Sequence, residues 1–328
     1  MTGERTTALP DLSVVVIARN EEDRIGDCLN SVFTATDAFD SEVVVVDSNS
    51  TDRTVERARE FPVSVLRIPD DDLTTPSAGR FVGAAFADGE QVLFVDGDMV
   101  LEDGWLEPAA EMLAENPDLA GVGGHLDQTD ATELREPDWL HGVALYDADA
   151  LASVGGFDPF LRALEDLHLG FELTAEGYRL ARLPVTVSDH AREASDYLEP
   201  VRRWRRGFFH GVADALFRSA SSPRLLAAHL RAKRHALAVG GWLLVGFGSL
   251  VALPAFLLWL AASAVGFAVL ARLEGFERAY KLVTLWVLLW GGVATHEWRA
   301  PRERDEYPLD SIEEVESGPR LTTAVQGD

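Results

Sequence analysis

Short continuous hydrophobic runs divide the first half of the chain, and the segments that follow them carry apolar residues at helical spacing. The runs are LSVVVIA, EVVVVD, VSVLRI and QVLFVD. The segment after the first run, NEEDRIGDCLNSVF, puts five apolar residues between Ile25 and Phe33 on one face, and Asn20 is expected to cap this helix. Buried strands that alternate with helices predict an α/β domain with a mostly parallel central sheet covered on both faces.

Polar side chains collect where these predicted strands end. They are Arg19, Asn20 and Glu21 after the first strand, Asp47, Asn49 and Asp52 after the second, and Asp96 and Asp98 after the fourth. Ligands of parallel sheets bind beyond the carboxyl ends of the strands. A solvated turn would explain each loop by itself, but three acid-bearing loops at one edge predict a site for a cation and a polar ligand.

The middle region, residues 120–190, combines short strands with one long amphipathic segment. GGFDPFLRALEDLHLGFELTAEGYRL has an apolar helical face and a glycine, Gly177, suited to a helix C-terminus. Glu165 and Asp166 fall in or just before the first turn, where capping accounts for one acid but not two. His125 and His141 are interpreted as ordinary polar residues near a site mouth, with contact between His125 and an acceptor as the alternative.

Residues 202–206, RRWRR, form the densest basic cluster of the chain. One interpretation is a basic amphipathic helix leading to a membrane. The other is a phosphate or pyrophosphate site, because arginine offers planar bidentate donors. The two interpretations are compatible, and both stay open at this stage.

An uncharged apolar stretch covers residues 236–271, with Pro254 near its centre. It is too long for one membrane span and short for two full ones, so we expect a helical hairpin that turns near Pro254. A second run, residues 282–295, is a candidate third span or interfacial helix. The bases before the first span, among them Arg231, Lys233 and Arg234, predict that this side faces the cytoplasm.

These patterns predict five regions. They are an N-terminal tail (1–10), an α/β domain (11–215), a basic juxtamembrane linker (216–235), a membrane region of two or three helices (236–298) and an acidic disordered tail (299–328). The apolar run near the N-terminus is too short for a signal peptide, so the main domain is expected at the cell membrane, on its cytoplasmic side.

The 328-residue chain carries 54 acidic and 29 basic residues, for a formal charge of -25, and its lysines are Lys233 and Lys281. Such a surface repels nucleic acid and is typical of proteins that stay soluble in concentrated salt, where charge repulsion is screened. The single cysteine, Cys28, excludes an internal disulfide and a thiolate metal cluster, and its helical spacing predicts a core position.

Four motifs in order make the chain resemble family 2 glycosyltransferases, which have the nucleotide-sugar-binding fold called GT-A. They are VVIARNEE, VVDSNSTDRT, FVDGD, and LEDLHLGFEL before a Trp/Arg cluster, and together they cover residues 12 to about 206. The resemblance extends to membrane-anchored archaeal and bacterial enzymes of lipid-linked glycan assembly. It implies a UDP- or GDP-linked sugar donor and a divalent metal, Mg²⁺ or Mn²⁺, which carboxylate oxygens bind well.

The resemblance also assigns roles to individual residues. Asp98 is implied as metal ligand, with Asp96 in the metal shell or on the ribose, and Asp166 as the general base. The other implied donor contacts are Arg19, Glu22, Asp47 on the base, and Arg80. Implied contacts of the acceptor or of phosphate are Glu165, Arg203, Trp204 and Arg206.

A general base restricts the acceptor, because a sugar hydroxyl needs deprotonation whereas an ionised lipid phosphate does not. We therefore expect inverting transfer to a hydroxyl of a lipid-linked saccharide, with direct transfer to polyprenyl phosphate as the alternative. Pro200 replaces the glutamine that processive members carry three positions before Arg203, which favours single addition. A non-catalytic membrane scaffold is a third possibility, and a nucleotidyltransferase is disfavoured because no lysine precedes Lys233.

Overall fold

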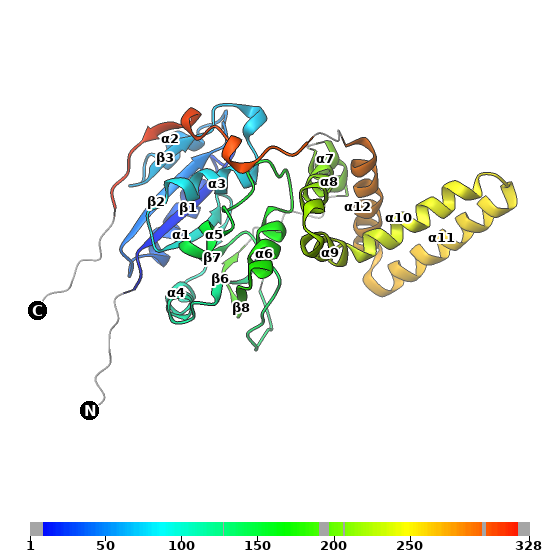
Figure 1. The fold of residues 1–328 in the computed structure, drawn as a ribbon, viewed down its shortest axis with the longest axis horizontal. Helices are drawn as coiled ribbons and strands as arrows, with labels where there is room; N and C mark the ends of the chain where they lie inside the picture. Colours follow the sequence, from blue (N-terminus) through cyan, green and yellow to red (C-terminus); the bar gives the residue numbers. More distant parts are fainter. Residues whose placement is uncertain (1–8, 127, 190–196, 206, 297–299, 321–328) are drawn as a thin grey trace, which may run out of the picture. The chain divides into compact units, whose positions relative to one another are not determined.

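The computed structural model describes residues 9–126, 128–189, 197–205, 207–296 and 300–320. The chain forms two compact units, which are described separately (Figure 1). The first consists of Met1–Leu161, Glu165–Arg192 and Arg302–Asp328, and the second of Arg162–Leu164 and Glu193–Pro301. The α/β domain was predicted to end at residue 215. The first unit instead leaves the chain at Arg192 and also includes the C-terminal segment from Arg302 onward.

An eight-stranded sheet forms the centre of the first unit, in the order β10-β3-β2-β1-β4-β7-β6-β8. The strands are β1 (Leu12–Ala18), β2 (Ser41–Asp47), β3 (Ser64–Arg67), β4 (Gln91–Asp96), β6 (Leu119–His125), β7 (Ala144–Asp147), β8 (Arg179–Thr186) and β10 (Glu313–Glu316). Only β7 and β10 run antiparallel to their neighbours in this sheet. The predicted mostly parallel α/β architecture is confirmed. A small second sheet pairs β5 (Val100–Leu101) with β9 (Ser188–Asp189).

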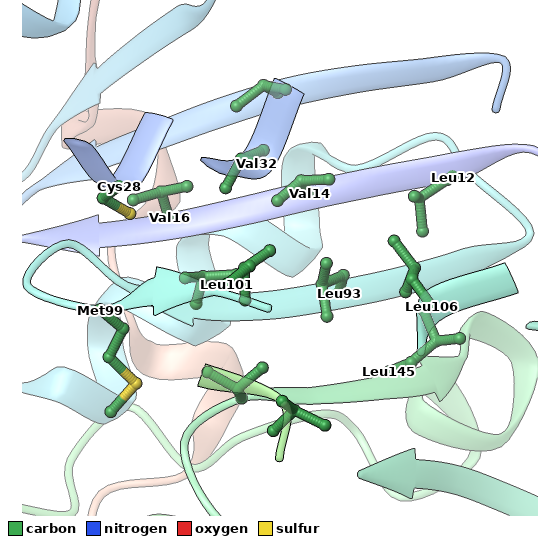
Figure 2. Packing of buried hydrophobic residues seen from close by; sticks show 14 of the residues in the cluster. Leu12, Val14, Val16, Cys28, Val32, Leu93, Met99, Leu101, Leu106 and Leu145 are labelled. Atoms are coloured by element: carbon green, nitrogen blue, oxygen red, sulfur yellow. The ribbon is translucent and has the colours of Figure 1, made fainter. Parts of the chain in front are cut away.

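Helices cover both faces of the sheet, which explains the continuous apolar runs. On one face, Leu12, Val14 and Val16 of β1 pack with α1 (Ile25–Ala35), α2 (Thr54–Ala58) and α4 (Leu106–Glu115) (Figure 2). On the other, Val15 and Ile17 pack with α3 (Pro76–Phe86), α5 (Ala148–Ser153) and α6 (Glu165–Glu176). Alternate side chains of a strand point to opposite faces, so a strand buried on both sides is apolar throughout.

Two local predictions have different outcomes. Cys28 is fully buried in the core, as its spacing predicts. The prediction that Asn20 caps the first helix is wrong, because α1 begins only at Ile25. Asn20 instead adopts a left-handed conformation (φ 57°), and its side-chain oxygen accepts a hydrogen bond from the Thr51 amide at 2.9 Å. The asparagine therefore joins the loops that follow β1 and β2.

The prediction that residues 299–328 form a disordered tail is wrong for the described part, residues 300–320. This segment contains two short 3₁₀ helices, Arg304–Glu306 and Leu309–Ser311, and then adds β10 antiparallel to β3. Tyr307 is 3% exposed and packs edge-on against Phe81. The acidic composition hides a few anchoring residues, and these bury enough apolar surface to order the segment.

Tyr307→Ala is expected to lower the free energy of unfolding of the first unit by about 3 kcal/mol, because it leaves a cavity between Phe81 and Phe160. Tyr307→Phe removes only the 3.3 Å hydrogen bond to the Leu73 carbonyl and should cost about 1 kcal/mol or less. Urea unfolding followed by tryptophan fluorescence measures both. Equal midpoints for wild type and Tyr307→Ala would contradict the anchoring role.

The second unit is helical. Its elements are α7 (Glu199–Arg205), α8 (Phe208–Arg218), η2 (Ser219–Ser221), α9 (Pro223–Ala232), α10 (Arg234–Ser249), α11 (Leu253–Glu274) and α12 (Phe276–Thr295). Residues 216–235, predicted as a linker, are thus mostly helical. Helices α10 and α11 form the hairpin predicted near Pro254, and Gly246 packs directly against the Trp259 ring. Small residues let helices approach closely, as in membrane bundles.

Of the helices in the described part of the chain, one is long and apolar enough to cross a bilayer. It is α11, whose 22 residues include an 18-residue window of mean hydropathy 2.1, none of it buried. Its neighbour α10 has 16 residues. Exposed apolar side chains are frequent on both helices, among them Phe247 (76% exposed) and Leu258 (72%).

Candidate active site

An open cleft of roughly 730 Å³ lies at the carboxyl ends of the parallel strands. Loops after β1, β2 and β4 and the first turns of α3 and α6 line it, with Ile17, Ala18, Arg19, Glu21, Ser48, Thr74, Thr75, Pro76, Arg80, Asp96, Gly97, Asp98 and Glu165. Six residues singled out in the sequence therefore share one cleft: Arg19, Glu21, Arg80, Asp96, Asp98 and Glu165.

Arg80 is the centre of the polar network in this cleft. Its side chain is 3% exposed, and its Nη2 donates to Asp96 Oδ1 at 2.6 Å. Nη1 donates to Glu165 Oε1 at 3.2 Å, and Nε lies 4.0 Å from Asp166 Oδ1. One buried guanidinium thus connects the end of β4 with the start of α6, two segments about 70 residues apart in the sequence.

The start of α3 is built to hold Arg80 in place. The Thr75 side chain caps the helix by accepting from the Ala78 amide at 2.8 Å, and Pro76 occupies the first helical position. Thr75 also donates to the Pro159 carbonyl at 2.9 Å. The sequence TPSAGR therefore fixes both the helix start and the depth of its arginine.

The charges around Arg80 shift the pKa values of both partners. Burial alone would lower the pKa of Arg80, but Asp96, Asp166 and Glu165 together raise it, so the guanidinium stays ionised. The pKa of Asp166 is raised to about 7, chiefly by burial. Glu165 and Asp96 also raise it, whereas Arg80 and a hydrogen bond from the Gly142 backbone lower it. A carboxyl group that titrates near neutral pH can accept a proton during a reaction.

Gly97 sets the geometry of the Asp96-Gly97-Asp98 turn. Its amide donates to the Ile17 carbonyl at 2.8 Å, and a Cβ at this position would lie 3.1 Å from the Ala18 side chain. The turn therefore lies close against the end of β1. This contact leaves the side chains of Asp96 and Asp98, one residue to either side, on the cleft wall.

The negative charge of the carboxylates around Asp98 is only partly balanced by nearby arginine side chains. Asp98 is 28% exposed and lies 3.4 Å from Arg24. Burial raises the pKa of the neighbouring Glu21, and the negative charges of Asp98, Asp52 and Asp96 raise it too, although Arg24 opposes them. A cleft wall with this excess of negative charge favours a bound cation.

Asp96 and Asp98 suit a hard divalent cation that takes few protein ligands. Among the residues that the structure describes, no group of three or more His, Cys, Asp or Glu side chains is arranged to hold a metal ion. Mg²⁺ and similar ions usually bind one or two carboxylates and complete their shell with water and phosphate oxygens. The donor set fits such an ion only when a phosphate-bearing ligand shares the cleft.

Unusual backbone conformations occur next to residues that line the cleft. Among the residues that the structure describes, three non-glycine residues have positive φ angles: Asn20, Asn49 and Leu164, which follow Arg19, follow Ser48 and precede Glu165, respectively. Side-chain hydrogen bonds hold the first two loops; Arg19 binds Asp71 at 2.9 Å, and the Asn49 amide group donates to the same carboxylate at 3.3 Å. Such conformations persist where surrounding contacts enforce them, which is common at functional sites.

Two predicted donor contacts lie away from the cleft lining. Asp47 is fully buried and accepts from Arg67 Nε at 3.0 Å and from the Ser50 amide at 3.1 Å. Glu22 accepts from Arg53 through the backbone amide (3.1 Å) and Nε (3.2 Å). Both side chains organise the loops that border the cleft, and their contacts with a nucleotide stay predictions.

The predicted acceptor contacts near residue 204 belong to the second unit. Trp204 packs against Gly291 of α12 and near Phe209, so packing already accounts for its ring. The Arg203 guanidinium lies 5.2 Å from the centre of the Phe208 ring. Arg206 falls outside the described residues. The roles of these residues toward an acceptor stay predictions.

Sequence reasoning missed the role of Gly142. Its backbone hydrogen-bonds Asp166, and a Cβ there would lie 3.1 Å from Asp96 Oδ2. Nothing in the local pattern marks this glycine, because its partners come from β4 and α6. Thr74, which also lines the cleft, was equally hidden among ordinary loop residues.

Comparison with known proteins gives consistent matches. Residues 13–166 match the family described as Glycosyl transferase family 2. The Haloferax volcanii protein named Glycosyltransferase AglE is 33% identical over 129 residues, 38% of this chain and 42% of the relative. The 4,4'-diaponeurosporenoate glycosyltransferase of Staphylococcus haemolyticus is 31% identical over 105 residues, 31% of this chain and 27% of the relative. The chain thus spans less than half the length of these curated relatives.

Two solved structures share the fold over most of the chain. The mannosyltransferase PcManGT from Pyrobaculum calidifontis, in complex with GDP-Man and Mn²⁺, has a TM-score of 0.58 and 21% identity, covering 89% of this chain and 88% of its own. TarS 1–349 from S. aureus has a TM-score of 0.53 and 21% identity, covering 88% and 93%. At this identity the likeness concerns the fold, and it confirms the GT-A architecture predicted from the sequence.

Proposed function

We propose that this chain, whose residues 13–166 belong to glycosyl transferase family 2, moves a sugar from a nucleotide sugar to a hydroxyl group of a lipid-linked saccharide, with inversion at the anomeric carbon. The observation that carries the proposal is that carboxylates suited to two different roles, metal binding and proton transfer, lie near the same arginine. Asp96 and Asp98 line the cleft at the end of β4, and Asp166 begins α6 4.0 Å from the same Arg80.

The cleft residues would bind the donor through its diphosphate. Asp98, with Asp96, would hold Mg²⁺ or Mn²⁺, which stabilises the negative charge of a departing nucleoside diphosphate. PcManGT was solved with GDP-Man and Mn²⁺, and TarS also with UDP-GlcNAc, which supports a GDP- or UDP-linked donor. Arg19, 48% exposed on the cleft wall, would contact the donor directly.

Asp166 would act as the general base on the acceptor. It comes from a different segment than Asp96 and Asp98. Inversion would require its carboxylate to lie across the sugar from the metal, where it meets the attacking hydroxyl. Its carboxylate would take the proton of the attacking hydroxyl while the bond between the anomeric carbon and the nucleotide oxygen breaks. Arg80 and Gly142 would keep the carboxylate oriented between proton transfers.

The raised pKa of Asp166 predicts an acid limb in the pH profile. The base must be ionised, so kcat/KM is expected to rise with pH through the pKa of Asp166 and then level off. That pKa is about 7 in the free protein, and a bound cation would lower it by adding positive charge. The midpoint is therefore expected between about 4 and 7. Initial rates from pH 4 to 9 measure it, and a flat profile would count against Asp166 as base.

The second unit would hold the domain at a membrane, on its cytoplasmic side. Helix α11 has the length and hydropathy of a bilayer span, and its apolar side chains are exposed. A catalytic cleft at a membrane surface suits an acceptor carried on a polyprenyl or dolichyl phosphate. Fractionation of the full chain with and without α10–α12 tests this attachment.

Transfer of a radiolabelled sugar from GDP- and UDP-linked donors tests the reaction. One arm supplies a lipid-linked saccharide and the other polyprenyl phosphate alone, each with and without Mn²⁺. The proposal expects label in the first arm and dependence on the metal. Label only in the second arm would establish direct transfer of the sugar to polyprenyl phosphate. Binding of nucleotide sugars without transfer in either arm would favour a non-catalytic membrane scaffold.

A further inference from the structure

A second polar cluster lies in the first unit, and it is cationic. It consists of His125 at the end of β6, Arg135, Trp139 and His141 in the connection between β6 and β7, and Arg182 on β8; we call it the Arg135–Arg182 cluster. The Arg182 guanidinium lies 6.0 Å from the centre of the Trp139 ring, and its Nη2 donates to the Trp139 carbonyl at 3.2 Å. The rings of Trp139 and His141 are 4.3 Å apart.

The backbone holds the two arginines side by side. The Arg135 amide donates to the Arg182 carbonyl at 3.0 Å, and the Arg182 amide donates back to the Arg135 carbonyl at 2.8 Å. Two like charges are thus fixed on paired backbone positions. Like charges on directly paired positions are destabilising, and an anion bound between them would relieve this repulsion.

No carboxylate in the described part of the chain forms an ion pair with either arginine, although the chain has a net charge of -25. Arg179, three residues before Arg182, shows the contrast, because it binds Asp118 at 2.8 Å and Glu136 at 2.5 Å. The buried Nε of Arg182 also has no hydrogen-bond partner among the described residues. Burial, and after it Arg135, lower the pKa of Arg182, as expected for a cation without a counter-charge.

The histidines of the cluster lack acidic partners in the same way. Burial lowers the pKa of His141, and the charge of Arg182 lowers it further. The same two causes, with Arg135 added, lower the pKa of His125. Both rings are therefore neutral near pH 7 and can donate one N–H each.

The cluster adjoins the proposed base. Gly142, whose backbone hydrogen-bonds Asp166, directly follows His141. Gly170, one turn further along α6 than Asp166, packs against Trp139, where an added Cβ would lie 2.6 Å from the Trp139 backbone. None of the five cluster residues lines the donor cleft. The cluster is thus separate from the donor cleft and is linked to Asp166 through Gly142 and α6.

We propose that the Arg135–Arg182 cluster binds the phosphate group of the acceptor, that is, the phosphate or pyrophosphate that links the acceptor sugar to its lipid. The proposal rests on the proposed function and adds the recognition element of its acceptor. Arginine suits this role because its planar fork gives bidentate hydrogen bonds to phosphate oxygens, and neutral imidazole N–H groups add further donors. The bound anion would supply the missing counter-charge.

Binding without turnover tests this inference. The full chain in detergent is titrated with dolichyl phosphate in mixed micelles, with dolichol, and with inorganic pyrophosphate, and binding is followed by tryptophan fluorescence. Arg182→Gln and Arg135→Gln are expected to weaken dolichyl phosphate binding at least tenfold. Arg179→Gln, on the same strand but neutralised by two acids, should stay within twofold of wild type. The Arg135 side chain is exposed, so we expect its replacement to keep the fold.

Three results would overturn the inference. They are unchanged dolichyl phosphate binding in Arg135→Gln and Arg182→Gln, an equal loss in Arg179→Gln, and equal binding of dolichol. Arg182-dependent binding of inorganic pyrophosphate as tight as that of the lipid would assign the cluster to a free diphosphate instead. Because no donor is present, Arg182-dependent lipid binding together with absent sugar transfer would refute the proposed function and leave this inference standing.

Discussion

Asp166→Asn is expected to lower the rate of sugar transfer by about 10²- to 10⁴-fold while the affinity for the nucleotide donor changes little. The amide cannot take a proton from the acceptor hydroxyl, and this is the size of effect usual for a lost general base. The donor cleft stays intact, since its lining does not include Asp166. Single-turnover rates at saturating donor, with separate titration of the nucleotide, distinguish the two effects.

The same variant should not lose stability at neutral pH. The pKa of Asp166 in the folded protein lies above its ordinary value of about 3.9, so the folded state keeps this proton longer than the unfolded state. The contribution of Asp166 to the free energy of unfolding therefore falls as pH rises from about 4 to about 7. The uncharged asparagine side chain of Asp166→Asn does not ionise, so the variant does not lose this part of the free energy of unfolding. A variant that unfolds at pH 7 would show that Asp166 is structural.

Asp147→Asn is the matched control. Asp147, like Asp166, lies at the start of a helix. It is the N-cap of α5 and accepts a hydrogen bond from the Ala150 amide at 2.8 Å, but it does not line the cleft. Its replacement should leave transfer within a factor of about two. An equal loss of activity in Asp147→Asn and Asp166→Asn would remove the case for a specific base.

Asp98→Asn is expected to lower transfer by about 10²-fold or more, a loss of about 3 kcal/mol of transition-state stabilisation, and to abolish the effect of Mn²⁺ on donor binding. Asp98 is the less compensated acid of the turn, since Asp96 already binds Arg80 at 2.6 Å and Asp98 lies 3.4 Å from Arg24. Calorimetric titration of GDP and UDP with and without Mn²⁺ measures the change.

Asp103→Asn tests whether any acid of this region has the same effect. Asp103 lies five residues after Asp98, is exposed, and is absent from the cleft lining. Its replacement should leave metal-dependent binding unchanged. Metal-dependent nucleotide binding that persists in Asp98→Asn would place the cation elsewhere.

The parts of the fold that could be predicted depend on residues that are close together in the sequence. The continuous Val/Ile runs of β1 and β2 predict buried parallel strands, and acids at strand ends predict a cleft there, because strand direction fixes where these ends meet. Gly177, with a φ of 101°, follows α6 as its position predicts.

The parts that could not be predicted depend on residues far apart in the sequence. Asn20 has the composition of a helix cap, but its partner is Thr51 in another loop. The acidic composition of residues 300–320 conceals Tyr307, whose ring finds its pocket only after α3 is in place. Arg80 in an otherwise apolar helix is visible as an anomaly, yet its three carboxylate partners emerge only from the folded chain.

The most direct test of the central claim is a coupled measurement on the purified full chain. Nucleotide sugars, Mn²⁺ and a lipid-linked saccharide are supplied, and the nucleoside diphosphate released is compared with the sugar gained by the lipid fraction. We predict equal amounts of both for the wild type, with inverted anomeric configuration, and neither for Asp166→Asn or Asp98→Asn. Nucleotide release without sugar in the lipid fraction, or transfer that persists in Asp166→Asn, would contradict the account.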